Sequence, residues 1–256
     1  MLFRSWLVFA CLLLISVSAG SGEEKPARRA LLKGKLLMKS GVTKWDRSLM
    51  LQAKALFEQA IDDSAFAREA QYALGYACYR LANYALQSRE KREAKAMLDT
   101  ATIYLQNALR LDETDAEARA LLAMCYAQQA GLQRTKALAF GRRSKQLIEA
   151  AGQQAPANPR VALLRGLIEY HTPAMLGGNK KHALERMQHA TALFAVWQPP
   201  NEIAPNWGRA EAYAWLCRFY LDAGDTARAK SACQQALAIN PAYIWVKQSL
   251  LPMLEK

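Results

Sequence analysis

The sequence predicts an all-α protein, a right-handed α-solenoid of about five helical hairpins with a C-terminal capping helix. One observation is the segment 210–241, where large residues precede a Gly-Asp turn and small residues follow it, both at helical spacing. Pro241 ends that hairpin because proline cannot continue a helix. The other observation is composition, since Ala, Leu, Gln, Arg and Lys, which favour helices, dominate the middle of the chain. No segment alternates polar and β-branched residues as a strand would.

The same signals divide the rest of the chain into helices and loops. Proline and glycine predict loops over 152–159 and 198–208. The spacing from Gly75 to Ala101 is longer than that of the last hairpin, so both helices of the second hairpin are expected to be extended. The predicted hairpins occupy residues 27–64, 66–112, 116–151, 159–197 and 210–241, and the capping helix occupies residues 243–254.

The positions that define the last hairpin are Tyr213, Leu216, Tyr220, Gly224, Asp225, Ala229, Cys233, Ala236 and Pro241. In this order they resemble the tetratricopeptide repeat (TPR), a helical hairpin of about 34 residues. One TPR hairpin cannot bury its apolar face alone, so the resemblance implies a stacked array. It also implies that the first helices of successive hairpins line a concave surface on which partners dock.

A second group of residues lies in the C-terminal third of the chain. These residues are Thr172, Pro173, Met175, Gly177, Gly178, Trp207, Gly208, Tyr243, Trp245, Val246, Lys247, Leu250, Leu251 and Pro252. Their order is similar to that in a group of exported bacterial TPR proteins and, more loosely, in the periplasmic T-component of TRAP transport systems. The resemblance implies no catalytic residues. It implies, as an alternative function, a transport accessory protein that handles a small ligand near Gly177-Gly178 with a solute-binding partner.

Residues 1–19 have the features of a signal peptide. Arg4 supplies a positive start, residues 6–17 form an apolar run, and residues 17–19 offer a cleavage site of small residues. The apolar run is too short to span a bilayer, which needs about 20 residues. We therefore predict a periplasmic or secreted protein, with a signal peptide at 1–19, a linker at 20–26 and one TPR-like helical repeat domain at 27–256.

The chain is basic, with a formal net charge of +12. This charge favours acidic partners, although a basic surface also serves solubility. The export signal argues against nucleic acid. Between Lys25 and Arg47, eight basic residues accompany one acidic residue, Asp46. The helix in this region is therefore either the first helix of the array or a segment in peripheral contact with an anionic membrane.

Four cysteines remain after removal of the predicted signal peptide: Cys78, Cys125, Cys217 and Cys233. The last two fall on the two helices of one hairpin. They either pack as thiols or form a disulfide, which an exported protein permits. The cysteines are scattered and form no CxxC pair, so the sequence gives no reason to expect a zinc site.

The sequence contains no motif of a known catalytic site. It lacks the phosphate loops GxxxxGK[ST] and GxGxxG, the HExxH zinc motif and the GxSxG nucleophile elbow.

His182, Glu185 and His189 share one helical face, but solvated side chains explain this arrangement better than metal ligands. Gly177-Gly178 forms either a turn or an anion-binding nest. We predict no catalytic residue, cofactor or metal; an enzyme acting on envelope glycans is an alternative that only the basic charge suggests.

The repeat register of Gly75, Ala123, Gly166 and Cys217 predicts which side chains face the concave groove. The predicted surface is aromatic and basic, and it suits an extended peptide or an amphipathic helix that carries some negative charge. Four tryptophans near the C-terminus either fill the core or offer a platform for a carbohydrate or hydrophobic ligand: Trp197, Trp207, Trp215 and Trp245. The predicted partner-binding residues are Tyr72, Tyr76, Tyr79, Arg80, Met124, Gln128, Arg160, Leu163, Leu167, Tyr170 and Arg218.

These features predict an exported, non-enzymatic scaffold or adaptor that binds a protein or peptide partner in its groove. The Lys and Asn residues that clamp a C-terminal carboxylate in chaperone-binding TPR proteins are absent from the predicted groove positions. Capture of a chaperone tail is therefore not expected.

Overall fold

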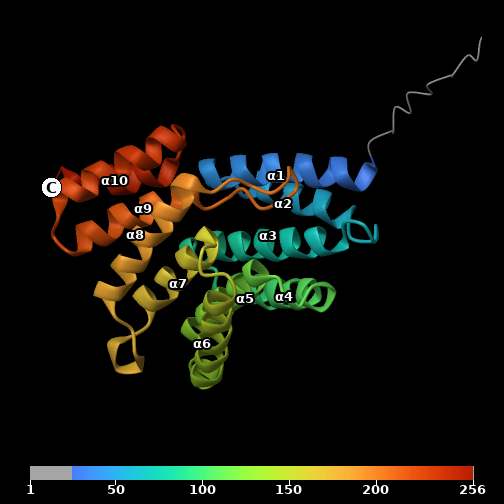
Figure 1. The fold of residues 1–256 in the computed structure, drawn as a ribbon, viewed down its shortest axis with the longest axis horizontal. Coiled ribbons are helices and arrows are strands. Elements are labelled where there is room, and N and C mark those ends of the chain that lie inside the picture. Colours follow the sequence, from blue (N-terminus) through green and yellow to red (C-terminus); the bar gives the residue numbers. More distant parts are fainter. Residues whose placement is uncertain (1–24, 256) are drawn as a thin grey trace, which may run out of the picture.

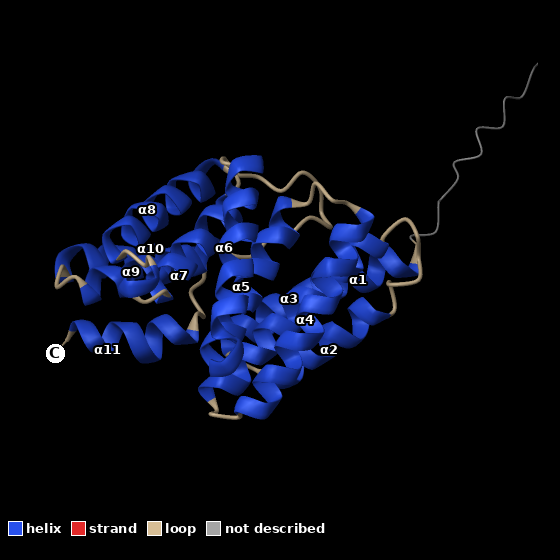
Figure 2. Cartoon of the chain, turned by 90° about the horizontal axis from the view of Figure 1, so that it is seen from below, coloured by secondary structure: helices blue, strands red, loops and turns tan. Residues whose placement is uncertain are grey.

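The computed structural model describes residues 25–255, and within that range it contains helices and connecting turns but no strand (Figure 2). The predicted signal peptide at 1–19 and residues 20–24 of the predicted linker lie outside the described residues. Among residues 25–255, no helix has both the length and the apolar character needed to cross a membrane. The expectation of an all-α fold is confirmed.

Consecutive helices form five hairpins that stack along the chain, followed by a short C-terminal helical segment (Figure 1). The hairpin helices are α1 (Pro26–Lys44), α2 (Arg47–Glu58), α3 (Ala67–Gln87), α4 (Lys91–Leu111), α5 (Ala116–Leu132), α6 (Ala137–Gln154), α7 (Pro159–His171), α8 (Lys180–Val196), α9 (Arg209–Asp222) and α10 (Thr226–Ile239). Short 3-10 helices cover η1 (Arg134–Lys136) and η2 (Ala174–Leu176), and the chain ends with the π-helical turn η3 (Val246–Leu250) and α11 (Leu251–Leu254).

Local sequence signals set where several helices begin. In each case an Asp or Asn side chain accepts hydrogen bonds from backbone N–H groups of the first turn, which would otherwise lack partners. The capping residues are Asp46 of α2, Asp115 of α5, Asn158 of α7, Asn179 of α8 and Asp225 of α10. Pro26 and Pro159 also occupy the first helical turn, where proline is tolerated.

Some helix ends differ from the sequence prediction. The first hairpin is predicted to reach residue 64, but its second helix, α2, ends at Glu58. Helix α6 extends to Gln154, so Gly152 is helical and not part of the predicted loop. Glycine lowers helix propensity but does not forbid a helix when neighbouring turns continue it.

The repeat register places small residues where paired helices cross. A Cβ atom on Gly75 of α3 would lie 2.5 Å from Cγ of Leu105 in α4. A Cβ atom on Gly166 of α7 would lie 3.4 Å from the carbonyl oxygen of Ala183 in α8. Cys217 of α9 likewise meets Cys233 of α10. Three hairpins thus use their predicted small positions in the same way, to bring the second helix close to the first.

We expect Gly75→Ala to lower the free energy of unfolding by about 1–3 kcal/mol, because the added methyl overpacks the core against Leu105. Leu105 is itself fully buried, so it cannot move aside into solvent. Gly141→Ala is the matched control, since nothing lies within 4 Å of its added Cβ. This helix-interior change should stabilise the protein by up to about 1 kcal/mol. Urea denaturation of both variants checks the prediction, and equal effects of the two would contradict it.

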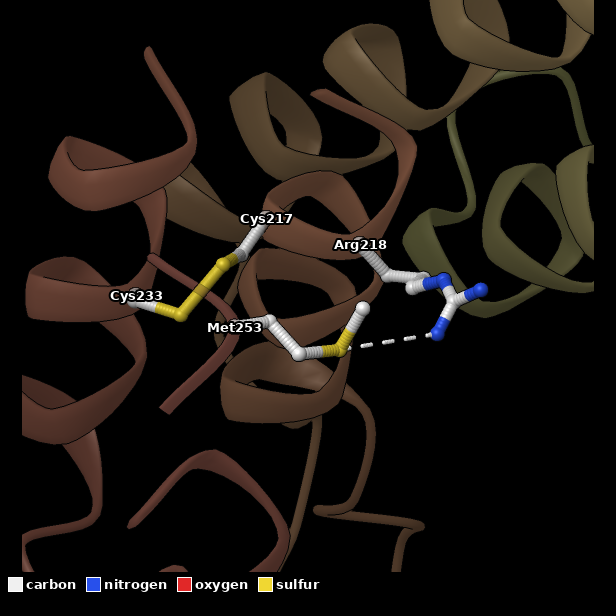
Figure 3. The surroundings of a disulfide bond; sticks show 4 residues. All are labelled: Cys217, Arg218, Cys233 and Met253. Atoms are coloured by element: carbon white, nitrogen blue, oxygen red, sulfur yellow. Dashed lines mark hydrogen bonds between the residues drawn. A yellow bond between two sulfur atoms is a disulfide. The ribbon is translucent and has the colours of Figure 1, made fainter. Parts of the chain in front are cut away.

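The fifth hairpin is held by a disulfide between Cys217 of α9 and Cys233 of α10 (Figure 3). Of the two alternatives that the sequence left open, the bond is the one formed. Beside it, Arg218 Nη1 lies 3.8 Å from Sδ of Met253 in α11. Cys78 and Cys125 are buried free thiols. Burial raises the pKa of Cys78 to about 12 and also raises that of Cys125, so both remain protonated packing residues at neutral pH.

Candidate functional site

The groove formed by the first helices is divided into a covered part and an open part. The cover is the strap, defined as residues 197–208 between α8 and α9, which runs alongside α1 in Figure 1. Trp207 of the strap stacks on Tyr76 of α3, with ring centroids 4.7 Å apart. Its indole Nε1 donates a hydrogen bond of 3.1 Å to the hydroxyl of Tyr72. The strap therefore occupies the aromatic surface of α3.

Arg160 of α7 connects the strap to the helices beneath it. Its Nε and Nη2 atoms donate to the two carboxylate oxygens of Glu117 in α5, each at 2.7 Å. Nη1 donates to the carbonyl oxygen of Trp207 at 3.3 Å, and the guanidinium lies 4.0 Å from the ring centroid of Trp197. Only 1% of Arg160 is exposed, so this bidentate ion pair is an internal feature of the fold.

The middle of the strap is attached to α1. Lys35 Nζ donates to the carbonyl oxygen of Ala204 at 2.6 Å and to that of Glu202. The Glu202 carboxylate forms an ion pair with Arg28. These contacts join residues separated by more than 160 positions in the sequence, and they hold an extended, proline-rich segment across the groove.

These contacts show that the strap covers part of the predicted binding surface. Tyr72, Tyr76, Arg160 and Leu163 belong to the first helices, as the register predicts, but all four are buried. Gly208, with φ of 103°, brings the end of the strap close to Leu163 and Arg160. The strap lies across these side chains, so a partner that docks on the outer surface of the groove would meet the strap first.

The open cleft lies beyond the strap and has a volume of about 1460 Å³. Its lining comes from α1, α3, α5, η1, α6, α7, η2, α8 and α9 and from the segment after α10. Five of the residues predicted to bind a partner line this cleft: Tyr79, Arg80, Met124, Gln128 and Leu167. The structure therefore brings this part of the predicted set together around one cavity, where four of the five side chains (Tyr79, Arg80, Met124 and Leu167) are themselves largely buried.

The cleft is positively charged. Seven basic side chains and three acidic ones line it: Lys44, Arg80, Arg134, Arg142, Lys145, Arg165 and Arg186, against Glu149, Glu169 and Glu211. The acidic side chains are each within ion-pair distance of a basic one, whereas no carboxylate of residues 25–255 pairs with Arg134, Arg142 or Arg165. Burial and the nearby Arg186 charge lower the pKa of Arg165. The unneutralised charge favours an anionic occupant.

Three buried polar atoms in the residues that line the cleft have no hydrogen-bond partner. They are Nε of Arg80, Oε1 of Gln128 and Oγ of Ser144. Arg80 is otherwise engaged, since its Nη1 donates to Glu211 at 2.8 Å and its guanidinium lies 5.8 Å from the ring of Trp45. A buried polar group without a partner costs about 1–3 kcal/mol, so a bound molecule that offers matching groups would be stabilised here.

Aromatic side chains form part of the lining of the cleft. Trp215 and Trp245 have ring centroids 4.9 Å apart, and Trp45 also lines the cavity. The four tryptophans considered from the sequence therefore separate into two pairs, with Trp197 and Trp207 on the strap. Trp45, Arg165 and Ser144 were missed by the sequence analysis because they lie outside the predicted groove register and no local pattern marks them.

Tyr170 and Arg218 do not line the open cleft. The ring of Tyr170 stacks on Phe219 at 4.0 Å and its hydroxyl donates to Asp222. Arg218 pairs with the same Asp222 carboxylate at 3.1 Å. Tyr170 therefore joins α7 to α9, whereas the Arg218 ion pair lies within α9.

The histidines of α8 and the glycine pair that precedes this helix are the remaining features noted in the sequence. No group of three or more His, Cys, Asp or Glu side chains in residues 25–255 is arranged to hold a metal ion. Gly177 ends η2 with φ of 92°, a left-handed conformation that suits glycine. A Cβ atom on Gly178 would lie 1.8 Å from the carbonyl oxygen of Thr172, so this position requires glycine for a close turn.

Comparisons with known proteins identify the fold. No family model matches the chain, and no curated protein matches its sequence. The structure is similar to that of TTC0263, a TPR protein of Thermus thermophilus, with 18% identity and a TM-score of 0.58 over 87% of this chain and 100% of that one. It is also similar to the HusA haemophore of Porphyromonas gingivalis, with 22% identity and a TM-score of 0.64 over 78% and 94% of the two chains. The chain therefore has a TPR-like fold.

Proposed function

We propose that this chain is an exported, non-enzymatic adaptor that holds an acidic segment of a protein partner in the open cleft. The observation that carries the proposal is the excess of basic over acidic side chains around a cavity of about 1460 Å³. Opposite charges steer such a partner to the cleft and fix its orientation. A TPR-like fold is consistent with this role, because helical arrays present extended concave surfaces.

Apolar groups at the rim define the kind of segment that fits. Leu138 of α6 and Leu176 of η2 both line the cleft, and they are 61% and 63% exposed. Met124 in the cleft adds a side chain that adapts to different shapes. An amphipathic peptide with acidic and aliphatic residues would bury these groups while it neutralises the arginines.

The proposal is tested with Arg142→Glu combined with Arg165→Glu. A photoreactive group at Leu138 would first capture the partner in cells, and the affinity of the purified pair would then be measured. We expect the double charge reversal to weaken binding at least tenfold at low salt, and the loss to shrink as salt screens the charges. The matched control reverses Arg92 and Lys230, two exposed residues that line neither cavity. Equal affinity of both double variants would refute the cleft as the site.

The location outside the cytoplasm is part of the proposal. It is supported by the predicted signal peptide at 1–19 and by the disulfide between Cys217 and Cys233, since disulfides persist in oxidising compartments. Fractionation of cells that express the full chain, together with alkylation of free thiols, tests it. A reduced protein recovered from the cytoplasmic fraction would contradict the proposed location.

A second candidate is a small planar anion in the aromatic end of the cleft. The specific observation is the unpartnered Arg80 Nε among Trp45 and Tyr79. The similar haemophore structure suggests haem as the probe, and the resemblance to TRAP T-components suggests a transport accessory role. Titration with haem should shift its absorbance with one-to-one stoichiometry and quench tryptophan fluorescence. An unchanged spectrum would remove this candidate and leave the peptide proposal intact.

Peripheral contact of α1 with an anionic membrane remains a further proposal. It is supported by Leu36, which is 68% exposed, and by the exposed Lys33 on the same helix. Lys35 is directed instead to the strap.

A further inference from the structure

The strap does not fill the space that it covers. A cavity of about 600 Å³ separates it from the helices beneath, and this volume lies within the range of about 300–1,000 Å³ typical of ligand sites. Closely packed interiors contain few voids larger than a water molecule. The wall is largely apolar, with aliphatic and aromatic side chains from α1, α2, α3 and the strap: Leu31, Met38, Val42, Phe57, Tyr76 and Ile203.

One half-buried ammonium group adjoins this apolar space without a counter-ion. Lys35 Nζ has three donors, and its partners are the carbonyl oxygens of Glu202 and Ala204. No ion pair joins it to a carboxylate of residues 25–255. The nearby Glu202 carboxylate favours the charged form of Lys35 but pairs with Arg28. Burial, aided by the positive charge of Arg160, lowers the pKa of Lys35 to about 8.

Several other charged side chains around the cavity are paired within the protein. Arg160 pairs with Glu117, and Glu211 pairs with Arg80. Arg68 likewise pairs with Glu69 and Asp115. Lys39 and Arg209 also line the cavity without a carboxylate partner among residues 25–255, but both are exposed to water. Buried charges in proteins are normally paired, so the partly buried Lys35 is the cation here that would gain most from an anion.

We propose that the cavity beneath the strap is a second binding site, for an aliphatic monocarboxylate such as a medium-chain fatty acid. The carboxylate accepts a hydrogen bond from Lys35 Nζ, and the hydrocarbon tail lies along Leu31, Met38 and Phe57. The ion pair supplies the missing counter-ion, and burial of the tail contributes about 0.8 kcal/mol per methylene group. This site is separate from the open cleft, so its failure would not bear on the proposed adaptor function.

Calorimetric titration of the mature protein with decanoate and with 1-decanol tests the proposal. We expect one molecule of decanoate per chain and at least tenfold weaker binding of the uncharged alcohol. Lys35→Met should remove this preference, whereas Lys33→Met, an exposed position on the same helix, should preserve it. Absence of decanoate binding, or an unchanged preference in Lys35→Met, would overturn the proposal.

A second variant separates loss of the charge from loosening of the strap. Ile203→Trp keeps Lys35 and fills the cavity from the strap side, so it should abolish binding of both decanoate and decanol. Thermal unfolding of each variant shows whether the fold is retained. Undiminished decanoate binding by a folded Ile203→Trp protein would place the ligand elsewhere and contradict the assignment.

Discussion

Replacement of Arg160 by Met should lower the free energy of unfolding by roughly 3–5 kcal/mol, the cost of removing one partner of a buried ion pair. The change leaves the Glu117 carboxylate without its two hydrogen bonds of 2.7 Å and removes the bond to the Trp207 carbonyl oxygen. It also removes the cation beneath Trp197. The strap should therefore detach before the rest of the protein unfolds.

Two measurements check this expectation. Urea denaturation gives the loss of stability, and limited proteolysis reports whether the bonds between residues 197 and 208 become accessible. Arg92→Met is the matched control, because Arg92 is exposed on α4 and should change stability by less than about 0.5 kcal/mol. A strap that stays protected in Arg160→Met, with stability near that of the control, would show that Arg160 does not hold it.

A double-mutant cycle tests the mechanism. Glu117→Gln removes the negative charge, so combining it with Arg160→Met should cost less than the sum of the two single changes. We expect an interaction energy of about 1–3 kcal/mol between the two positions. Strict additivity would mean that the pair contributes through packing and not through its charges.

Removal of the disulfide is the second large effect that we expect. Cys217→Ala combined with Cys233→Ala should destabilise the protein by about 3 kcal/mol, because the bond closes a loop with a sequence separation of 16. The bond joins α9 to α10, and α9 follows the strap directly. Loosening of this hairpin should therefore also weaken the contact of Trp207 with Tyr76.

Thermal unfolding with and without a reductant measures this effect. Reductant should lower the melting temperature of the wild-type protein and leave that of the double variant unchanged. The free thiols of Cys78 and Cys125 provide the internal control, since reduction alters neither of them. An identical response of both proteins to reductant would contradict a stabilising role for the bond.

Much of the architecture was predictable because its signals are local. The small residues Gly75 and Gly166 recur at one position of successive first helices, and both lie at helix crossings in the structure. Asp and Asn residues at helix starts act as caps over three residues or fewer. Helical periodicity also predicted the inward face of α3, which carries Tyr72 and Tyr76. Each of these features depends on neighbours within one hairpin.

The candidate site was predictable only in part. The register placed Tyr76 and Arg160 on the first helices, but it could not show that a proline-rich loop would cover them. That loop reaches α1 through contacts such as Lys35 with Ala204, which are 169 positions apart in the sequence. The spacing of residues along a helix gives no information about contacts between such distant segments. The five predicted residues that do line the open cleft, Tyr79 and Met124 among them, lie beyond the reach of the strap.

Hairpin number, helix boundaries to within a few residues and the inward faces of the helices thus follow from residue order, since turns, caps and 3.6-residue spacing are properties of short segments. Which part of the groove stays open follows from the packed fold alone. Stacking of Trp207 on Tyr76 and the ion pair of Arg160 with Glu117 exist only after α3, α5, α7 and the strap have come together. These contacts hold the strap over one part of the concave face. The basic cleft remains open.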